Sequence, residues 1–173
     1  IGYFFGLCPE DRKTEGIISD LTVRENIILA IQARDGIFKT IPRKKQEEIV
    51  DKYIKALDIK TPGSEQIMNN LSGGNQQKVI IARWLASNPE FLILDEPTRG
   101  VDVGAKAEIE KLIASLSREE GMAILFISSE LEEVIRCSDR VAVLRDRKKL
   151  TELTGEQIED STIMHIIASE DVG

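Results

Sequence analysis

Three short apolar runs in the chain have the length and composition of buried strands. They occupy residues 1–7, 91–94 and 122–128. Each run is continuously apolar instead of alternating with polar positions, which is typical of parallel strands buried on both faces. Because stretches with helical periodicity separate the runs, we predict an α/β fold with a parallel sheet that helices cover on both faces.

The region between the first two runs has helical patterns and no strand pattern of its own. Thr22 and Glu25 have the spacing of a capping box and predict the start of a helix, which Gly36 and Pro42 end. A second apolar helical face recurs over residues 43–57. This region is therefore predicted to be helical.

A third predicted helix starts at Ser72, a residue type that caps helices well, and it runs to about residue 87. The three helices suggest a helical subdomain inserted into the α/β core. We expect residues 1–20 to be the end of a core strand and the loop after it. Residues 21–88 would be the helical subdomain, and residues 89–173 would complete the core.

Further elements are predicted in the last part of the chain. Asp102 can cap a helix that stops at Gly121. Ser129 and Glu132 have the spacing of a capping box for another helix. A strand pair and a last helical pattern follow, with the strands at residues 140–145 and 149–153.

The composition excludes some classes of protein. An apolar fraction of 42% and a charged fraction of 31% over 173 residues are ordinary for a globular domain. The net charge of −7 argues against general nucleic-acid binding, which needs clustered Lys and Arg. We interpret the basic run within residues 145–149 as a solvated turn.

Cysteine and histidine chemistry is not indicated. Cys8 and Cys137 are far apart and have no metal or redox spacing, which favours a reducing compartment. His165, the only histidine, is interpreted as a packing or surface residue. No apolar run reaches the roughly 20 residues that cross a bilayer, so a membrane role would come through a partner. Since Ile1 already belongs to a strand pattern, we expect the chain to begin inside a domain.

Residues 71–77 have the sequence Leu-Ser-Gly-Gly-Asn-Gln-Gln and precede an apolar helical pattern. At a helix N-terminus the backbone N–H groups have no partner within the helix, and the helix dipole favours an anion. Gly73 and Gly74 would let a phosphate approach the backbone, and the Ser72 hydroxyl adds a donor. The alternative for Ser-Gly-Gly alone is a capped helix with a flexible start.

Two adjacent carboxylates follow the apolar strand at residues 91–94. In open α/β sheets, ligands bind at the carboxyl ends of such strands. Asp95 would hold Mg²⁺, directly or through water, and Glu96 would polarise the water that attacks a γ-phosphate. The alternative is that both acids only cap a loop. Together with the glycine-rich helix start, the pair predicts ATP chemistry.

These residues resemble the motifs of ATP-binding cassette (ABC) ATPases. Residues 71–77 resemble the signature motif of that family, residues 91–96 its Walker B strand and residues 98–102 its D-loop. Within the family, residues 9–16 (Pro-Glu-Asp-Arg-Lys-Thr-Glu-Gly) and residues 128–131 (Ser-Ser-Glu-Leu) are similar to the second cassette of tandem ATPase subunits. Those subunits belong to bacterial importers of monosaccharides of the ribose, galactose, xylose and arabinose type.

The resemblance implies a partial P-loop NTPase-like core that works with Mg-ATP. In the family two cassettes close head to tail, and the signature of one contacts the ATP that the other holds. The signature residues expected to do so are Leu71, Ser72, Gly73, Gly74, Asn75 and Gln76. Asp102 would be the D-loop aspartate, Asp95 would hold the metal, and Glu96 would be catalytic.

Two positions depart from the general family pattern. Glu10 stands where most cassettes have the Q-loop glutamine; its carboxylate could coordinate Mg²⁺, but it adds negative charge beside phosphate. Ser129 stands where most have the switch histidine, and its hydroxyl can donate one hydrogen bond but carries no positive charge. The alternative for Ser129 is the helix cap with Glu132. We expect the site with these two departures to be the slower of the pair.

No Gly-x-x-x-x-Gly-Lys-Ser/Thr string, the P-loop that wraps the β-phosphate, occurs in the chain. In the family this P-loop (Walker A) precedes the Q-loop, so we expect it upstream of Ile1. We therefore expect the chain alone to bind ATP weakly or not at all.

The resemblance also implies partners and a location. The partners are a first ABC cassette in the same polypeptide or in a dimer, the transmembrane permease subunits and, indirectly, a sugar-binding protein, with no nucleic acid. The expected place is the cytoplasmic face of the cell membrane, where ATP hydrolysis energises sugar import. Two alternatives stay open: a soluble cassette ATPase that acts on a ribosome or DNA, and a nonenzymatic fragment that binds a partner.

Overall fold

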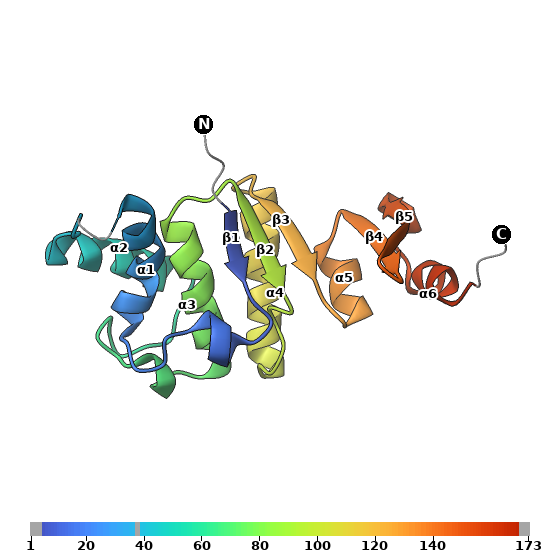
Figure 1. The fold of residues 1–173 in the computed structure, drawn as a ribbon. Coiled ribbons are helices and arrows are strands. Elements are labelled where there is room, and N and C mark those ends of the chain that lie inside the picture. The colour runs from blue at the N-terminus through green and yellow to red at the C-terminus, as the bar shows by residue number, and fades with distance from the viewer. Residues whose placement is uncertain (1–4, 37–38, 170–173) are drawn as a thin grey trace. The chain divides into compact units, whose positions relative to one another are not determined.

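A computed structural model describes residues 5–36 and 39–169 of the chain. The chain divides into two compact units, Ile1–Ile127 and Ser128–Gly173. The first contains a parallel sheet with helices α1 to α4, and the second contains a strand pair with helices α5 and α6 (Figure 1). The first four residues of the predicted first strand lie outside the described residues. No helix in the described ranges is long and apolar enough to cross a membrane.

The three apolar runs form a parallel sheet, as the sequence predicts. Its strands, in the order β1-β2-β3, are β1 (Phe5–Cys8), β2 (Phe91–Asp95) and β3 (Ala123–Ile127). Leu7 pairs with Ile93, which in turn pairs with Leu125. The predicted pair of carboxylates, Asp95 and Glu96, begins at the carboxyl end of β2.

The helical patterns form helices close to the predicted positions. α1 begins with the predicted capping box: the Thr22 hydroxyl accepts a hydrogen bond from the Glu25 N–H, and the Glu25 carboxylate accepts one from the Thr22 N–H. The helices of the first unit are α1 (Val23–Asp35), α2 (Arg43–Ala56), α3 (Gly73–Ala86) and α4 (Val103–Arg118). Single turns at Arg12–Gly16 and Met68–Asn70 precede α1 and α3. The subdomain boundaries at residues 20 and 88 stay a prediction.

One face of the sheet lies in the core of the first unit. Cys8, Leu92 and Leu94 are fully buried, in one cluster with apolar side chains of α3 and α4. A Cβ added at Gly6 would lie 2.9 Å from the Cβ of Trp84 on α3. β1 can approach α3 this closely because residue 6 has no side chain, and Trp84 packs against the core.

The opposite face of the sheet is uncovered in the described part of the chain. Phe5 and Leu7 of β1 are 57% and 47% exposed, and Leu125 and Ile127 of β3 are 45% and 42% exposed. Among the described residues of the first unit, the prediction that helices cover both faces is thus wrong. A continuously apolar strand shows that both faces can be buried, but it does not say which segment covers them.

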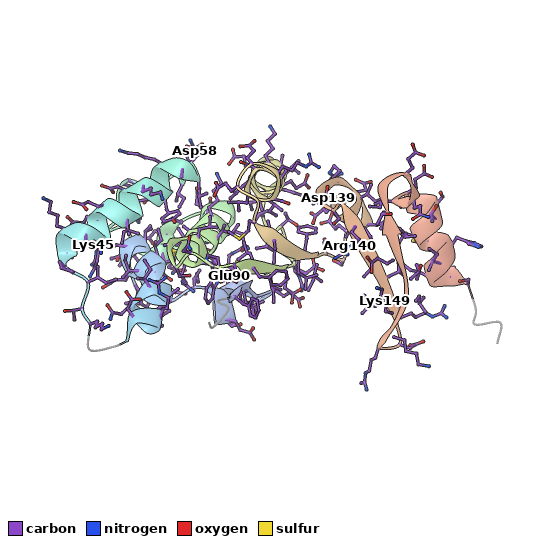
Figure 2. All side chains as sticks on the ribbon, turned by 90° about the horizontal axis from the view of Figure 1, so that it is seen from above. Lys45, Asp58, Glu90, Asp139, Arg140 and Lys149 are labelled. Carbon is purple, nitrogen blue, oxygen red and sulfur yellow. The ribbon has the colours of Figure 1, made fainter. Side chains whose placement is uncertain are left out.

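The second unit has a small core of its own, made by Val141, Val143, Leu153 and Ile163. Its elements are α5 (Leu131–Cys137), the antiparallel pair β4 (Arg140–Arg145) and β5 (Lys148–Thr154), and α6 (Asp160–Ala168). This confirms the predicted strand pair and last helix. Arg140 and Lys149, which Figure 2 marks on this hairpin, both pair with the carboxylate of Glu152. His165 is an exposed residue of α6, one of the two places predicted for it.

Helix α5 starts differently from the prediction. Its N-cap residue is Glu130. The Ser128 hydroxyl accepts a hydrogen bond from the Glu130 N–H at 3.0 Å and donates one to the buried Glu133 carboxylate at 2.8 Å. The predicted capping box of Ser129 and Glu132 is therefore wrong. Two consecutive serines offer the same hydroxyl, so the sequence alone does not show which of them bonds to the N-cap residue Glu130.

Candidate functional site

The glycine-rich segment forms the N-terminus of α3. Ser72 is the N-cap residue, and Gly73 is the first residue of the helix. The hydroxyl of the exposed Ser72 makes no capping bond to the backbone but accepts a hydrogen bond from Asn75 Nδ2 at 2.8 Å. The N-cap side chain therefore leaves the first N–H groups of α3 uncapped, which is the arrangement that suits an anion.

Both glycines are required by close neighbours. A Cβ at Gly74 would lie 2.4 Å from the Cβ of Ala105, in the first turn of α4. A Cβ at Gly73 would lie 2.9 Å from Nη2 of Arg12 and 3.2 Å from the carbonyl oxygen of Gly100. The two glycines thus let α4 and the loop at Arg12 approach the start of α3, in addition to any role toward a phosphate.

The other predicted signature residues contact the protein itself. Leu71 is a buried member of the core. Asn75 Oδ1 accepts a hydrogen bond from the Lys60 N–H at 2.7 Å. Gln76, which is 6% exposed, donates to the Met68 carbonyl and accepts from Nε of Arg12, both at 3.3 Å. These side chains hold the start of α3 in place, whereas Ser72 is exposed and its side chain does not cap the helix.

The predicted carboxylates lie at the end of β2. Asp95 is its last residue and is half-buried. Glu96 has a φ of +47°, a left-handed conformation that is uncommon for residues other than glycine. Its N–H donates to the Ile127 carbonyl at 2.9 Å, and its carbonyl accepts from the Arg99 N–H at 3.1 Å. Such strain concentrates at functional sites, and here two backbone hydrogen bonds maintain it.

Glu10 lies in an open cleft of about 420 Å³ that is lined by Glu10, Asp11, Arg12, Lys13 and Arg99. The Glu10 carboxylate is paired with the guanidinium of Arg99. Hydrogen bonds from the side chain and N–H of Thr14 and from the Lys13 N–H hold the pKa of Asp11 below its usual value. Glu10 therefore contacts the segment that follows Glu96.

Asp102 has the capping role that the sequence predicts. Its Oδ1 accepts a hydrogen bond from the Ala105 N–H at 3.0 Å, at the N-terminus of α4. Because Ala105 also packs against Gly74, this cap belongs to the same contact region as the start of α3. The D-loop role of Asp102 stays a prediction.

Ser129 belongs to the second unit, directly after the hydroxyl of Ser128 that binds Glu133. The structure therefore brings together Glu10, Arg99 and the start of α3 within the first unit. The position of Ser129 is described with the second unit alone, and its proposed role as the switch residue stays a prediction.

The chemistry of the acids fits a magnesium ion that is bound together with phosphate. No group of three or more Asp, Glu, His or Cys residues gathers into a metal cage within residues 5–36 and 39–169. Mg²⁺ in nucleotide sites needs only one or two carboxylates because phosphates and water supply its other ligands. Asp95 is suited to be one of them, while Glu10 would first have to leave Arg99.

Three buried cations around α3 were not found from the sequence. Lys78 pairs with Glu108 of α4 at 2.7 Å, and Arg83 donates to the carbonyls of Gly16 and Asn26 at 2.6 and 2.7 Å. Arg12, which is 9% exposed, contacts the start of α3. Burial lowers the pKa of both arginines. Their sequence neighbourhoods look like ordinary charged surface, so long-range contacts alone distinguish them.

A sequence profile described as ABC transporter matches residues 5–99, which is more than half of the chain. The chain belongs to the ABC transporter family. This confirms the resemblance seen in the motifs at residues 71–77 and 91–96 and includes the loop at Glu10.

Curated relatives of this ABC protein are ATP-binding proteins for sugars. It is 56% identical over 164 residues to the galactofuranose transporter ATP-binding protein YtfR of Escherichia coli O157:H7, covering 95% of this chain and 33% of that protein. It is 54% identical to the fructose import ATP-binding protein FruK of Bifidobacterium longum, covering 94% and 32%. It is 46% identical to the ribose import ATP-binding protein RbsA of Clostridium perfringens, covering 93% and 32%. The chain spans about a third of the length of these relatives.

Solved structures show the same fold. The ABC chain aligns with a dimeric ATP-binding cassette in a post-hydrolysis state, bound to ADP and Pi, with a TM-score of 0.73 and 25% identity; the alignment covers 88% of this chain and 63% of that one. An inward-facing ABC transporter aligns with a TM-score of 0.81 and 18% identity, over 95% of this chain and 64% of that one. These matches confirm the predicted α/β fold with its parallel sheet.

Proposed function

We propose that this chain is part of an ATP-hydrolysing subunit that energises sugar import, and that it supplies most of the second cassette of that subunit. The observation that carries this proposal is the joint presence of the Ser72–Gly73–Gly74 helix start and the Asp95–Glu96 pair on one ABC fold. The names of the relatives support sugars as the cargo, since they specify galactofuranose, fructose and ribose.

The start of α3 would contact the ATP held by the first cassette. Its uncapped N–H groups and the Ser72 hydroxyl are donors that a γ-phosphate can use. The dimeric state of the neighbour that binds ADP and Pi supports such a two-cassette arrangement. The phosphate would then stabilise the closed pair, and hydrolysis would weaken that attraction.

The carboxylates of this chain would serve a second ATP. Mg²⁺, when bound, would neutralise phosphate charge. Asp95 would hold the metal, and Glu96 would polarise and orient the water that attacks the γ-phosphate, giving ADP and phosphate. Glu10 and Ser129 would complete this site. Without a switch histidine it would be the slower of the two sites.

The loop that contains Glu10, together with helices α1 and α2, would pass the motion to the permease. The loop is fixed to helix α3 at both of its ends: Arg12 binds Gln76, and Arg83 binds the Gly16 carbonyl. Movement at the start of α3 would therefore move the loop as well. The permease, a first cassette and indirectly a sugar-binding protein are the proposed partners, at the cytoplasmic face of the membrane.

The test is ATP turnover by the full-length protein. With the site of the first cassette inactivated, we expect Glu96→Gln to reduce the remaining kcat by at least about 100-fold, because it removes a group that acts only on the attacking water. Glu90→Gln is the matched control: Glu90 is exposed just before β2, at the opposite end of the strand (Figure 2), and its variant should keep full turnover. Turnover that does not depend on Glu96 would contradict the proposal and leave the nonenzymatic alternative.

A further inference from the structure

Arg12 connects its own loop to two segments that lie far from it in the sequence. Its Nε donates to Oε1 of Gln76 on α3, and its Nη1 donates to the carbonyl of Arg99, which follows Glu96; both distances are 3.3 Å. Its Nη2 lies 2.9 Å from the place where a Cβ of Gly73 would be. One guanidinium from the loop after β1 therefore contacts both the start of α3 and the turn after the carboxylates.

The two residues that Arg12 binds, Gln76 and Arg99, are themselves held by further hydrogen bonds and an ion pair. Gln76 also donates to the Met68 carbonyl at 3.3 Å, so its amide cannot rotate freely. The Arg99 N–H donates to the Glu96 carbonyl at 3.1 Å, and the Arg99 side chain pairs with Glu10. Arg12 is thus the central member of a network that runs from Met68 to Glu96.

Geometry and burial indicate a specific requirement for arginine. Arg12 is only 9% exposed and binds two neutral oxygens, an arrangement that costs desolvation without an ion pair in return. The planar fork offers Nε and Nη1 at a fixed spacing, which a lysine ammonium cannot reproduce. The missing side chain of Gly73 leaves the space that the guanidinium needs.

We propose that Arg12 is a positioning residue that holds the start of α3 at a fixed distance from the turn after Asp95 and Glu96. This inference rests on the proposed function, since the two segments would act on phosphates. Arg12 does so through Gln76 and the Arg99 carbonyl rather than by binding a phosphate itself. Through the Arg99 side chain, the same network includes Glu10.

The experiment uses the full-length protein without nucleotide and measures amide hydrogen exchange. In Arg12→Lys, exchange of the Gln76 and Arg99 amides should rise about tenfold, because the hydrogen bonds that fix these segments are lost. Glu15→Gln changes an exposed residue of the same loop and should leave both amides unchanged. Unchanged exchange in Arg12→Lys would overturn the proposal. Hydrogen exchange does not depend on ATP hydrolysis, so a failure of this proposal can be distinguished from a failure of the Glu96 test.

A second measurement separates positioning from phosphate binding. We expect Arg12→Lys to reduce kcat for ATP about tenfold with little change in KM, and to add no further loss in a Gln76→Ala background. An equal loss in both backgrounds, or a rise in KM alone, would mean that Arg12 acts on the nucleotide directly and would overturn the proposal. Because Arg12→Lys keeps the charge and most of the side-chain volume, it should fold where Arg12→Ala fails.

Discussion

The two halves of helix α3 differ in what holds them. The second half contributes fully buried apolar side chains, including Ile80, Ile81 and Ala82, to the core. The first turn has small and polar residues, and segments from other parts of the chain contact them. One buried arginine belongs to each half: Arg83 extends from the second half, and Arg12 reaches the first turn from the loop. Apolar burial anchors the helix, whereas polar contacts determine where its N-terminus lies.

This contrast predicts that the largest losses of stability come from changes in the second half, and that changes to the polar side chains at the start of α3 cost function more than stability. Arg83→Ala should have the largest effect on stability, about 3–5 kcal/mol, because it removes the buried side chain that donates to the Gly16 carbonyl and to the carbonyl and side-chain oxygens of Asn26. Urea unfolding measures the loss. Lys45→Ala, on an exposed residue of α2 (Figure 2), is the control and should change stability by less than about 0.5 kcal/mol.

Gly74→Ala should destabilise by about 1–3 kcal/mol, since its Cβ would overlap with Ala105 and push α3 and α4 apart. The matched control is Gly63→Ala, because Gly63 has no atom within 4 Å of its added Cβ. Thermal unfolding of both variants measures the difference in their stability. Equal stability of the two variants would show that α3 and α4 are not packed closely at this point.

The free energy of unfolding should depend on pH because of the buried thiol of Cys8, which lies near Arg83. Burial raises the pKa of the Cys8 thiol from 9.0 to about 12, while nearby Arg83 partly offsets this. The folded chain therefore keeps a proton that the unfolded chain releases near pH 9, so this stabilisation is complete below pH 9 and is lost between pH 9 and 12. The expected loss is about 1.4 kcal/mol for each pH unit.

Denaturant unfolding at pH 8, 9 and 10 measures this effect. Cys8→Ala is the reference, because it retains every other group that titrates in this range. The wild-type chain should lose more stability than Cys8→Ala as the pH rises. Parallel curves for the two proteins would contradict the assigned pKa.

Ser72→Ala should have the smallest effect on stability, below about 0.5 kcal/mol, although an N-cap serine commonly contributes about 1 kcal/mol. The reason is that the Ser72 hydroxyl accepts only from the Asn75 side chain and makes no bond to the helix backbone. In the full-length protein the same variant should reduce ATP turnover. A large loss of stability would show that Ser72 is a helix cap and would favour the structural alternative.

Local signals predicted the elements of the fold well. The Thr22 and Glu25 box, the Asp102 cap and the continuous apolar strands depend on neighbours in the sequence, so they could be identified without the fold. Ser129 was misjudged because Ser128 offers an equivalent hydroxyl one residue earlier. The uncovered face of the sheet could not be predicted because apolar strands do not specify what covers them.

The motifs of the site could be predicted from the sequence, but the long-range contacts that hold them in place could not. Glycines before a helix and carboxylates after a strand are local patterns with a chemical meaning. Arg12 lies in a loop of mixed charge that looks solvated, and its partners are 64 and 87 residues away. Only the folded chain shows that this arginine is buried and that Gly73 leaves space for it.

The central claim is that the start of α3 and the Asp95–Glu96 pair are parts of two ATP sites, neither of which this chain completes alone. Calorimetric titration of the isolated chain with Mg-ATP tests it directly, with the full-length protein measured under the same conditions. We predict saturable binding by the full-length protein and binding weaker than about 1 mM by the isolated chain, which has no P-loop string. Micromolar binding by the isolated chain would contradict the account.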